Sequence, residues 1–200
     1  MKEKFIEIFK LNISRPGSDK LLAWLETTDF FEAPASTRFH LSRPGGLVEH
    51  SIHVYERLLK LYIAEKTDPV QPGPYFPLAE ELETITICGL LHDLCKANFY
   101  TVEMRNRKNE AGQWEKYPFY VVNDQLPYGH GEKSVYIISG FMKLTREEAM
   151  AIRWHMGFSD TDFKGGGYSV GNAFEKFPLA LLTHMADLQA TYLDEAGDNA

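Results

Sequence analysis

Apolar residues recur with the spacing of one helix face along most of this chain of 200 residues. The longest such run covers about 47–66, where Ile52, Tyr55 and Leu59 fall on the repeat, and it stops at a turn-forming segment, 68–74. Helices are predicted over about 3–12, 18–26, 47–66, 78–97, 131–142, 146–156 and 177–194. The pattern therefore predicts a mostly α protein built as a helical bundle.

The period changes from helical to alternating between about 99 and 122. Apolar and polar residues alternate from Tyr100 to Met104, and a second aromatic and β-branched run follows at 117–122. Pro118 suits only the edge of a sheet, because proline has no N–H to donate. These features predict a small two-stranded β-hairpin, at about 99–122, inserted into the helical domain.

Local signals refine the helix ends. Thr145 and Glu148 form a capping-box pattern at the start of one helix, and Ser18 or Asp19 is expected to cap another. The three glycines at 165–167 predict a loop.

One domain is expected for a chain of this length. It comprises N-terminal helices over 1–44 that pack on the core, a principal domain over 45–194, and a flexible tail over 195–200.

Composition excludes several classes of protein. The formal net charge of −7 argues against non-specific binding to duplex nucleic acid. The two cysteines, Cys88 and Cys95, lie in one apolar segment and are expected to be buried free thiols. The N-terminus has no long apolar run, and no stretch is apolar enough to span a membrane. We therefore expect a cytoplasmic protein that does not associate with membranes.

The most informative pair is His92 and Asp93, adjacent in an apolar helical segment. A buried carboxylate is costly unless it is paired or binds a metal ion. Imidazole and carboxylate ligands suit divalent transition metals, and a helical bundle can bring them together from facing helices. The chain holds four further candidates in segments that are mostly helical: His50, His130, His155 and Asp187.

Five short segments resemble the HD superfamily of metal-dependent phosphohydrolases. They are Gly-Gly-Leu-Val-Glu-His at 45–50, Leu-Leu-His-Asp-Leu-Cys-Lys at 90–96, Tyr-Gly-His-Gly-Glu-Lys-Ser at 128–134, Arg-Trp-His-Met-Gly at 153–157 and His-Met-Ala-Asp at 184–187. The first and third are similar to bacterial members that include a 3′–5′ exoribonuclease. The resemblance implies an HD-domain helical fold and a divalent metal centre.

The ligand set follows from the resemblance. One metal ion is implied to be bound by His50, His92, Asp93 and Asp187. Members with two further histidines hold a second ion bridged by the same Asp, and His130 and His155 occupy those places. The metal is expected to be one or two ions of Mn, Fe, Ni, Co, Zn or Mg.

The sequence departs from the family pattern at Cys95, where glycine is usual. We expect this change to alter helix packing more than metal ligation. The segment 99–127 looks like a family-variable insertion.

Several residues around the ligands are candidates for phosphate binding or support. Lys96, one helical turn after Asp93, and Arg153 are predicted catalytic residues that hold phosphate oxygens, and Lys133 is a weaker candidate. Glu132, His53 and His184 are candidates for orienting the metal ligands, and His40 is expected at the surface.

The resemblance and the acidic charge predict a metal-dependent phosphohydrolase that uses metal-activated water on a small phosphorylated substrate, a nucleotide or another small phosphoester. Nucleic acid is a less favoured partner. A 3′–5′ exonuclease-like phosphodiesterase on single-stranded RNA or DNA would need stacking platforms, for which the hairpin aromatics Trp114, Tyr117, Phe119 and Tyr120 are candidates. We favour instead that these aromatics dock the hairpin onto the helices. Two further alternatives are a non-catalytic metal- or nucleotide-binding module and an oxygenase of the same fold.

Overall fold

The computed structural model describes residues 1–70, 73–159 and 168–197. The helices are α1 Lys2–Asn12, α2 Ser18–Leu25, α3 Gly46–Lys66, α4 Ala79–Leu91, α5 His130–Ser139, α6 Arg146–Arg153, α7 Ser169–Lys176 and α8 Pro178–Gln189. Short 3₁₀ turns at Leu94–Lys96 (η1) and Gly157–Ser159 (η2) follow α4 and α6, and a π-helix at Ala190–Asp194 (η4) continues α8. The predicted mostly α fold with a small hairpin is confirmed.

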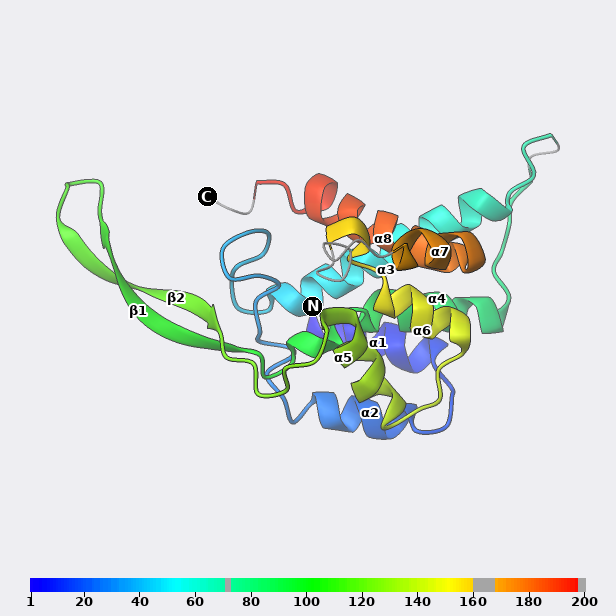
Figure 1. Ribbon diagram of the computed structural model, residues 1–200, viewed down its shortest axis with the longest axis horizontal. Helices are drawn as coiled ribbons and strands as arrows, with labels where there is room; N and C mark the ends of the chain where they lie inside the picture. The colour runs from blue at the N-terminus through cyan, green and yellow to red at the C-terminus, as the bar shows by residue number, and fades with distance from the viewer. Residues whose placement is uncertain (71–72, 160–167, 198–200) are drawn as a thin grey trace.

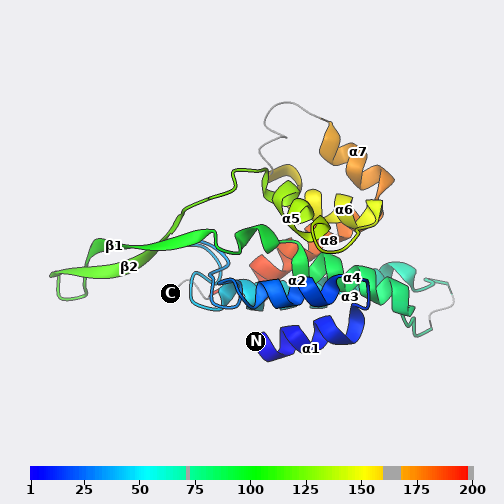
Figure 2. The same ribbon diagram turned by 90° about the horizontal axis from the view of Figure 1, so that it is seen from below.

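The helices pack in layers around α3 and α4 (Figure 1). Seen from below, α1 lies on one side of this central pair, and α5, α6 and α8 lie on the other, with α7 outermost (Figure 2). Among the described residues, no helix is both long and apolar enough to cross a bilayer.

One hydrophobic core joins the N-terminal helices to the rest of the chain. Phe5 of α1 and Leu21 of α2 are fully buried in the same cluster as Ile52 of α3 and Ile87 of α4. Each such side chain contributes about 1.5–3 kcal/mol when it is removed from water. Helices α1 and α2 therefore share one core with α3 and α4.

The hairpin reaches out from the helical body (Figure 1). It consists of β1 Tyr100–Lys108 and β2 Trp114–Val122, antiparallel, with Met104 opposite Pro118. Because only these two strands form the sheet, Pro118 lies on an edge strand, as predicted.

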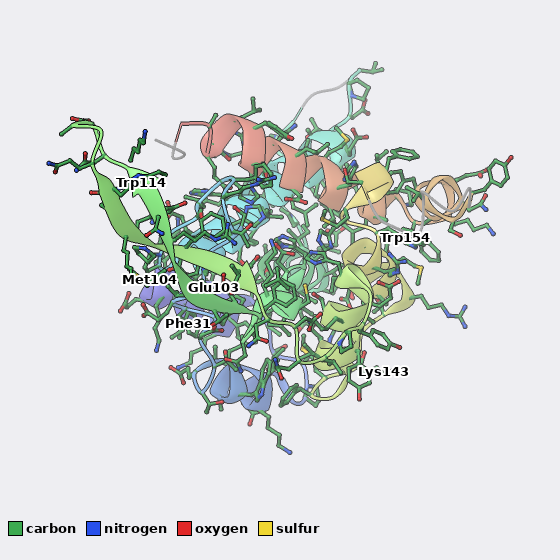
Figure 3. The ribbon with its side chains drawn as sticks, turned by 60° about the vertical axis from the view of Figure 1, so that its left-hand side comes forward. Phe31, Glu103, Met104, Trp114, Lys143 and Trp154 are labelled. Carbon is green, nitrogen blue, oxygen red and sulfur yellow. The ribbon has the colours of Figure 1, made fainter. Side chains whose placement is uncertain are left out.

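The hairpin aromatics stack mainly on cations of the hairpin itself. The guanidinium of Arg105 lies 3.8 Å from the ring centre of Phe119, and that of Arg107 lies 4.9 Å from Tyr117. Trp114, on the outer part of the hairpin (Figure 3), is 70% exposed. The expectation that these aromatics dock the hairpin onto the helices is wrong for Trp114, Tyr117 and Phe119. The rings of Tyr117 and Phe119 stack on cations of the hairpin itself, and Trp114 lies in solvent.

Several helix ends differ from the sequence predictions; the helix predicted over 131–142, for example, ends at Ser139. The helix predicted to run to 97 ends at Leu91, and the one predicted to run to 156 ends at Arg153. Gly17, not Ser18 or Asp19, is the N-cap of α2; its φ of +92° lets the chain turn tightly after Pro16. The short helix α7 was not predicted: it has only eight residues, and Gly171 among them is a poor helix former.

The capping box at Thr145 and Glu148 is confirmed by hydrogen bonds in both directions. The loop predicted at 165–167 lies outside the described residues. Glu195, which we placed in a flexible tail, is only 1% exposed, because it binds two histidines of α3.

Candidate metal centre

The ends of several helices bring the six predicted ligands together. His50 lies in the first turns of α3, His130 begins α5, and Asp187 lies near the end of α8. The other three ligands directly follow helices that end early: His92, Asp93 and His155.

Breaking the helix after Leu91 has a geometric effect on the His-Asp pair. Consecutive side chains of an α-helix point about 100° apart. Asp93 leaves helical geometry, with φ −101° and ψ 22°, and begins the 3₁₀ turn η1. His92 and Asp93 can therefore face one centre although they are adjacent.

One oxygen of Asp93 belongs to a first group of ligand atoms. Asp93 Oδ2 lies 3.8 Å from Nε2 of His50 and 3.5 Å from Nε2 of His92. The two imidazole nitrogens are 3.3 Å apart, and Asp187 Oδ1 lies 3.2 Å from Nε2 of His50. His50, His92 and Asp93 thus form one group of ligand atoms, and Asp187 joins it through its contact with His50.

The other oxygen of Asp93 belongs to a second group. Asp93 Oδ1 lies 2.8 Å from Nε2 of His130 and 3.5 Å from Nε2 of His155. These three side chains, like the trio of His50, His92 and Asp93, have ligand atoms within 4.8 Å of one another. The geometry therefore suits a carboxylate that bridges two cations.

Three of the four histidines are held through Nδ1. His92 donates to the carbonyl of Gly89 at 2.9 Å, and His155 donates to that of Ile152 at 2.6 Å. His50 Nδ1 lies 3.0 Å from the Glu195 carboxylate. A partner at Nδ1 fixes the tautomer in which Nε2 is the free ligand atom.

Two glycines permit the close approach that the site needs. A Cβ at Gly89 of α4 would lie 2.5 Å from Cα of Tyr55 in α3, which brings His92 against His50. A Cβ at Gly131 of α5 would lie 2.2 Å from the Arg153 carbonyl oxygen at the end of α6, so no larger residue fits between the helices that carry His130 and His155.

The electrostatics keep both carboxylates ionised. Burial alone would raise the pKa of Asp93, but Lys96 and the neighbouring histidines hold it well below its usual range. For Asp187, too, burial is outweighed, mainly by its hydrogen bond to His50, and its pKa is lowered. Burial opposes protonation of His50 and His130, yet their acidic and thiol neighbours raise the pKa of each to about 10.

Lys96 lies at the centre. Its Nζ donates to Asp93 Oδ2 at 2.6 Å and to the Ala35 carbonyl at 2.7 Å. Both Lys96 and Asp93 line a cavity of about 740 Å³, with His50, His130 and Asp187 also in its wall. A positive charge therefore faces the space next to the ligand atoms.

Arg153 and Lys133 have different surroundings from those predicted. The guanidinium of Arg153 pairs with Glu132 and lies 3.9 Å from the ring centre of Trp154, and Arg153 is not in the cavity wall. Lys133 pairs with Asp124 and is buried. The geometry supports neither residue as a phosphate ligand. Glu132, which was a candidate for orienting His130, pairs with Arg153 instead.

The remaining histidines, His40, His53 and His184, contact the proposed ligands or their hydrogen-bond partners. His53 Nδ1 contacts Glu195 at 2.9 Å, and His184 Nδ1 donates to the His155 carbonyl at 2.7 Å. His40, expected at the surface, lines the cavity with its ring centre 4.9 Å from that of His50, and burial lowers its pKa to about 4. Loop packing between α2 and α3 places His40 there, which no local pattern signals.

Glu195 is the residue that sequence reasoning missed. Burial would raise its pKa, but hydrogen bonds from His50 and His53 lower it to about 2. In the sequence, Glu195 lies in an acidic, turn-rich segment. No motif marks it as a partner of the ligands, and only its position eight residues after Asp187 places it near them.

The family model of the HD domain matches residues 47–196. The chain therefore belongs to the HD domain family, whose members are generally metal-dependent hydrolases that bind divalent cations. No curated protein and no solved structure was found to match the chain.

The residues present fit a divalent cation. Nε2 of His155 is buried and has no hydrogen-bond partner among the described residues, although its neighbour Asp93 is ionised. Buried polar atoms are normally paired, and a cation between this nitrogen and the Asp93 carboxylate would satisfy both.

Proposed function

We propose that the protein is a metal-dependent phosphohydrolase that cleaves a nucleotide or another small phosphoester. The observation that carries the proposal is the position of Asp93, whose two oxygens face two separate groups of imidazole nitrogens. His50, His92, Asp93 and Asp187 would hold one cation, and Asp93, His130 and His155 would hold a second. A divalent cation at such a centre lowers the pKa of water towards neutrality and polarises a phosphoryl oxygen.

The cavity and its charge support the substrate class. A volume of about 740 Å³ falls in the range of small-molecule sites. Two of the three N–H groups of Lys96 have partners among the described residues, which leaves the third for a phosphate oxygen. In the cavity wall, Tyr192 is 70% exposed and could stack on a base, whereas the ring of Phe39 already has the guanidinium of Arg38 5.0 Å from its centre.

The roles of the residues follow from these positions. Asp93 keeps its negative charge and would balance the charge of the cations. Lys96 stabilises the negative charge that develops on the phosphoryl oxygens, because a fixed cation in a sheltered site needs no reorganisation during the reaction. The Nδ1 partners of His50, His92 and His155 keep their Nε2 atoms turned to the centre.

The hairpin gives less support to an exonuclease. Among the described residues, only Tyr100 and Val122 of its strands reach the cavity wall, and Arg105 and Arg107 already stack on aromatic rings. A cationic track from the hairpin to the centre is therefore not formed by these residues. Strongly salt-dependent binding of single-stranded RNA would favour the exonuclease instead.

Elemental analysis of the purified, manganese-reconstituted protein tests the proposal. We expect close to two ions in the wild type and one in His130→Ala. Thr37→Ala is the matched control, because Thr37 also lines the cavity but is neither a proposed ligand nor a partner of one, and it should retain both ions. Absence of metal from the wild type would overturn the proposal.

Hydrolysis is then measured with a chromogenic phosphodiester, a phosphomonoester and a nucleotide panel. Asp93→Asn should abolish turnover and leave the fold, monitored by circular dichroism, intact. Two bound ions without turnover of any phosphoester would favour the metal-binding module.

A further inference from the structure

The carboxylate of Glu195 is enclosed by imidazoles. It lies 3.0 Å and 3.1 Å from Nδ1 of His50 and 2.9 Å from Nδ1 of His53, and His40 Nε2 is 4.0 Å away. The side chain is fully buried, and no lysine or arginine contacts it in the described part of the chain. A buried carboxylate without a strong cation is costly, so its contacts with histidines must hold it in place.

A π-helix puts Glu195 in this position. After Gln189 the chain widens into η4, and the N–H of Glu195 donates to the Ala190 carbonyl five residues earlier. Such π turns are rare and often occur at functional sites. Here the wide turn directs Glu195 towards α3, the same helix that Asp187 faces from α8.

His50 is consequently held at both ring nitrogens by one continuous C-terminal segment. Asp187 Oδ1 lies 3.2 Å from its Nε2, and Glu195 lies 3.0 Å from its Nδ1. In metal sites, a carboxylate at the far nitrogen of a histidine ligand orients the ring and increases its basicity.

We propose that Glu195 is a positioning residue for the metal centre: it accepts the Nδ1–H of His50 and thereby presents Nε2 of His50 as the ligand. His53, one helical turn after His50, fixes the Glu195 carboxylate in turn. The inference rests on the proposed function and adds a residue that acts on the first of the two cation positions only.

Titration of the metal-free protein with Co²⁺, followed by its visible absorption, tests the role of Glu195. Glu195→Gln should weaken binding at the position that contains His50 about 10- to 100-fold. It should leave the position that contains His130 unchanged. Glu195→Asp should recover part of the loss, because a carboxylate is restored. Nitrogen-15 NMR of labelled histidine in the Zn²⁺-loaded protein, where the His50 ring is neutral, should show less of the Nδ1–H tautomer of His50 in Glu195→Gln than in the wild type.

Asp194→Asn is the matched control. Asp194 pairs with Arg57 at the same turn but does not contact His50. It should retain wild-type affinity. Thermal unfolding of each metal-free variant checks that the fold persists, and His53→Ala, which leaves the contact between His50 and Glu195 in place, should cause a smaller loss than Glu195→Gln.

The outcomes separate the two proposals. A wild type that binds no cation would overturn the proposed function. A wild type that binds Co²⁺ with an affinity that Glu195→Gln does not change would overturn the role of Glu195 alone. An equal loss in Asp194→Asn would also overturn it, because the turn would then matter only as an anchor.

Discussion

The sulfur of Cys95 lies 3.4 Å from Nδ1 of His130 and 3.8 Å from its Nε2. The sulfur therefore contacts the imidazole ring, with Nδ1 as the nearer nitrogen. Cys95 was expected to affect helix packing more than the ligands, but it touches a predicted ligand directly. The residue that replaces the family glycine therefore restricts the movement of His130.

Cys95→Gly should loosen His130 and weaken the second cation position on the order of tenfold, as changes next to metal ligands commonly do. Stepwise metal titration measures the effect. Cys88→Ala is the control, since Cys88 is also a buried free thiol and belongs to neither group of ligand atoms. Equal affinities in Cys95→Gly and the wild type would contradict the prediction.

Metal affinity should rise with pH. The pKa values of His50 and His130 are about 10 in the metal-free protein, so both rings carry a proton at pH 7 that a cation must displace. Each displaced proton strengthens the apparent affinity by up to about tenfold per pH unit below that pKa. Titrations between pH 6 and about 9, with proton release recorded in a weakly buffered solution, check this. An affinity that does not change with pH would contradict it.

The close contact between Gly131 and Arg153 allows the spacing of α5 and α6 to be changed without replacing a ligand. Gly131→Ala should push α5 from α6, because the added Cβ would lie 2.2 Å from the Arg153 carbonyl oxygen. We expect a loss of about 1–3 kcal/mol in the free energy of unfolding, with weaker binding at the position of His130. Gly171→Ala in α7 is the control: nothing lies within 4 Å of its Cβ, so denaturant unfolding should show no loss. Similar destabilisation of both variants would contradict the prediction.

A buried ion pair away from the centre should govern acid stability. Arg15 contacts both oxygens of the fully buried Glu148, at 2.6 Å and 2.9 Å, and Thr84 donates to the same carboxylate. Glu148→Gln removes one of the two carboxylates that pair with Arg15, with Glu83 as the other, and should cost about 1–3 kcal/mol at pH 7. The exposed neighbour variant Glu147→Gln should cost little, as measured by urea denaturation.

The pH dependence of this pair has a defined sign. Burial would raise the pKa of Glu148, but Arg15 and Thr145 lower it below the ordinary 4.5. A carboxylate with a lowered folded pKa stabilises the protein above the unfolded pKa, and the contribution is lost as the pH falls through the folded value. The difference between the wild type and Glu148→Gln should therefore shrink below pH 4.5. A constant difference into strong acid would contradict the assignment.

Periodicity predicted the long helices and the hairpin, because each buries or alternates its side chains in a regular way. It did not predict that α4 stops at Leu91, since His92 and Asp93 continue an apolar segment and only tertiary contacts draw them out of the helix. The six predicted ligands could be read from the motifs, and the structure brings all six together.

The surroundings of the ligands could not be read in the same way. Arg153 and Lys133 are ordinary cations in the sequence, and only packing pairs them with Glu132 and Asp124. Glu195 reaches His50 through a π turn across 145 positions, a contact that no local pattern encodes.

That long separation has a consequence for stability. His50 in α3 and the segment after α8 meet at the centre, so a cation held there would cross-link the earliest and latest parts of the family domain, as a distant disulfide does in other proteins. A ligand that binds only the folded state adds about 2.7 kcal/mol when present at 100 times its Kd. Chelators should therefore lower the melting temperature, and the metal centre would stabilise the fold in addition to its proposed catalytic role.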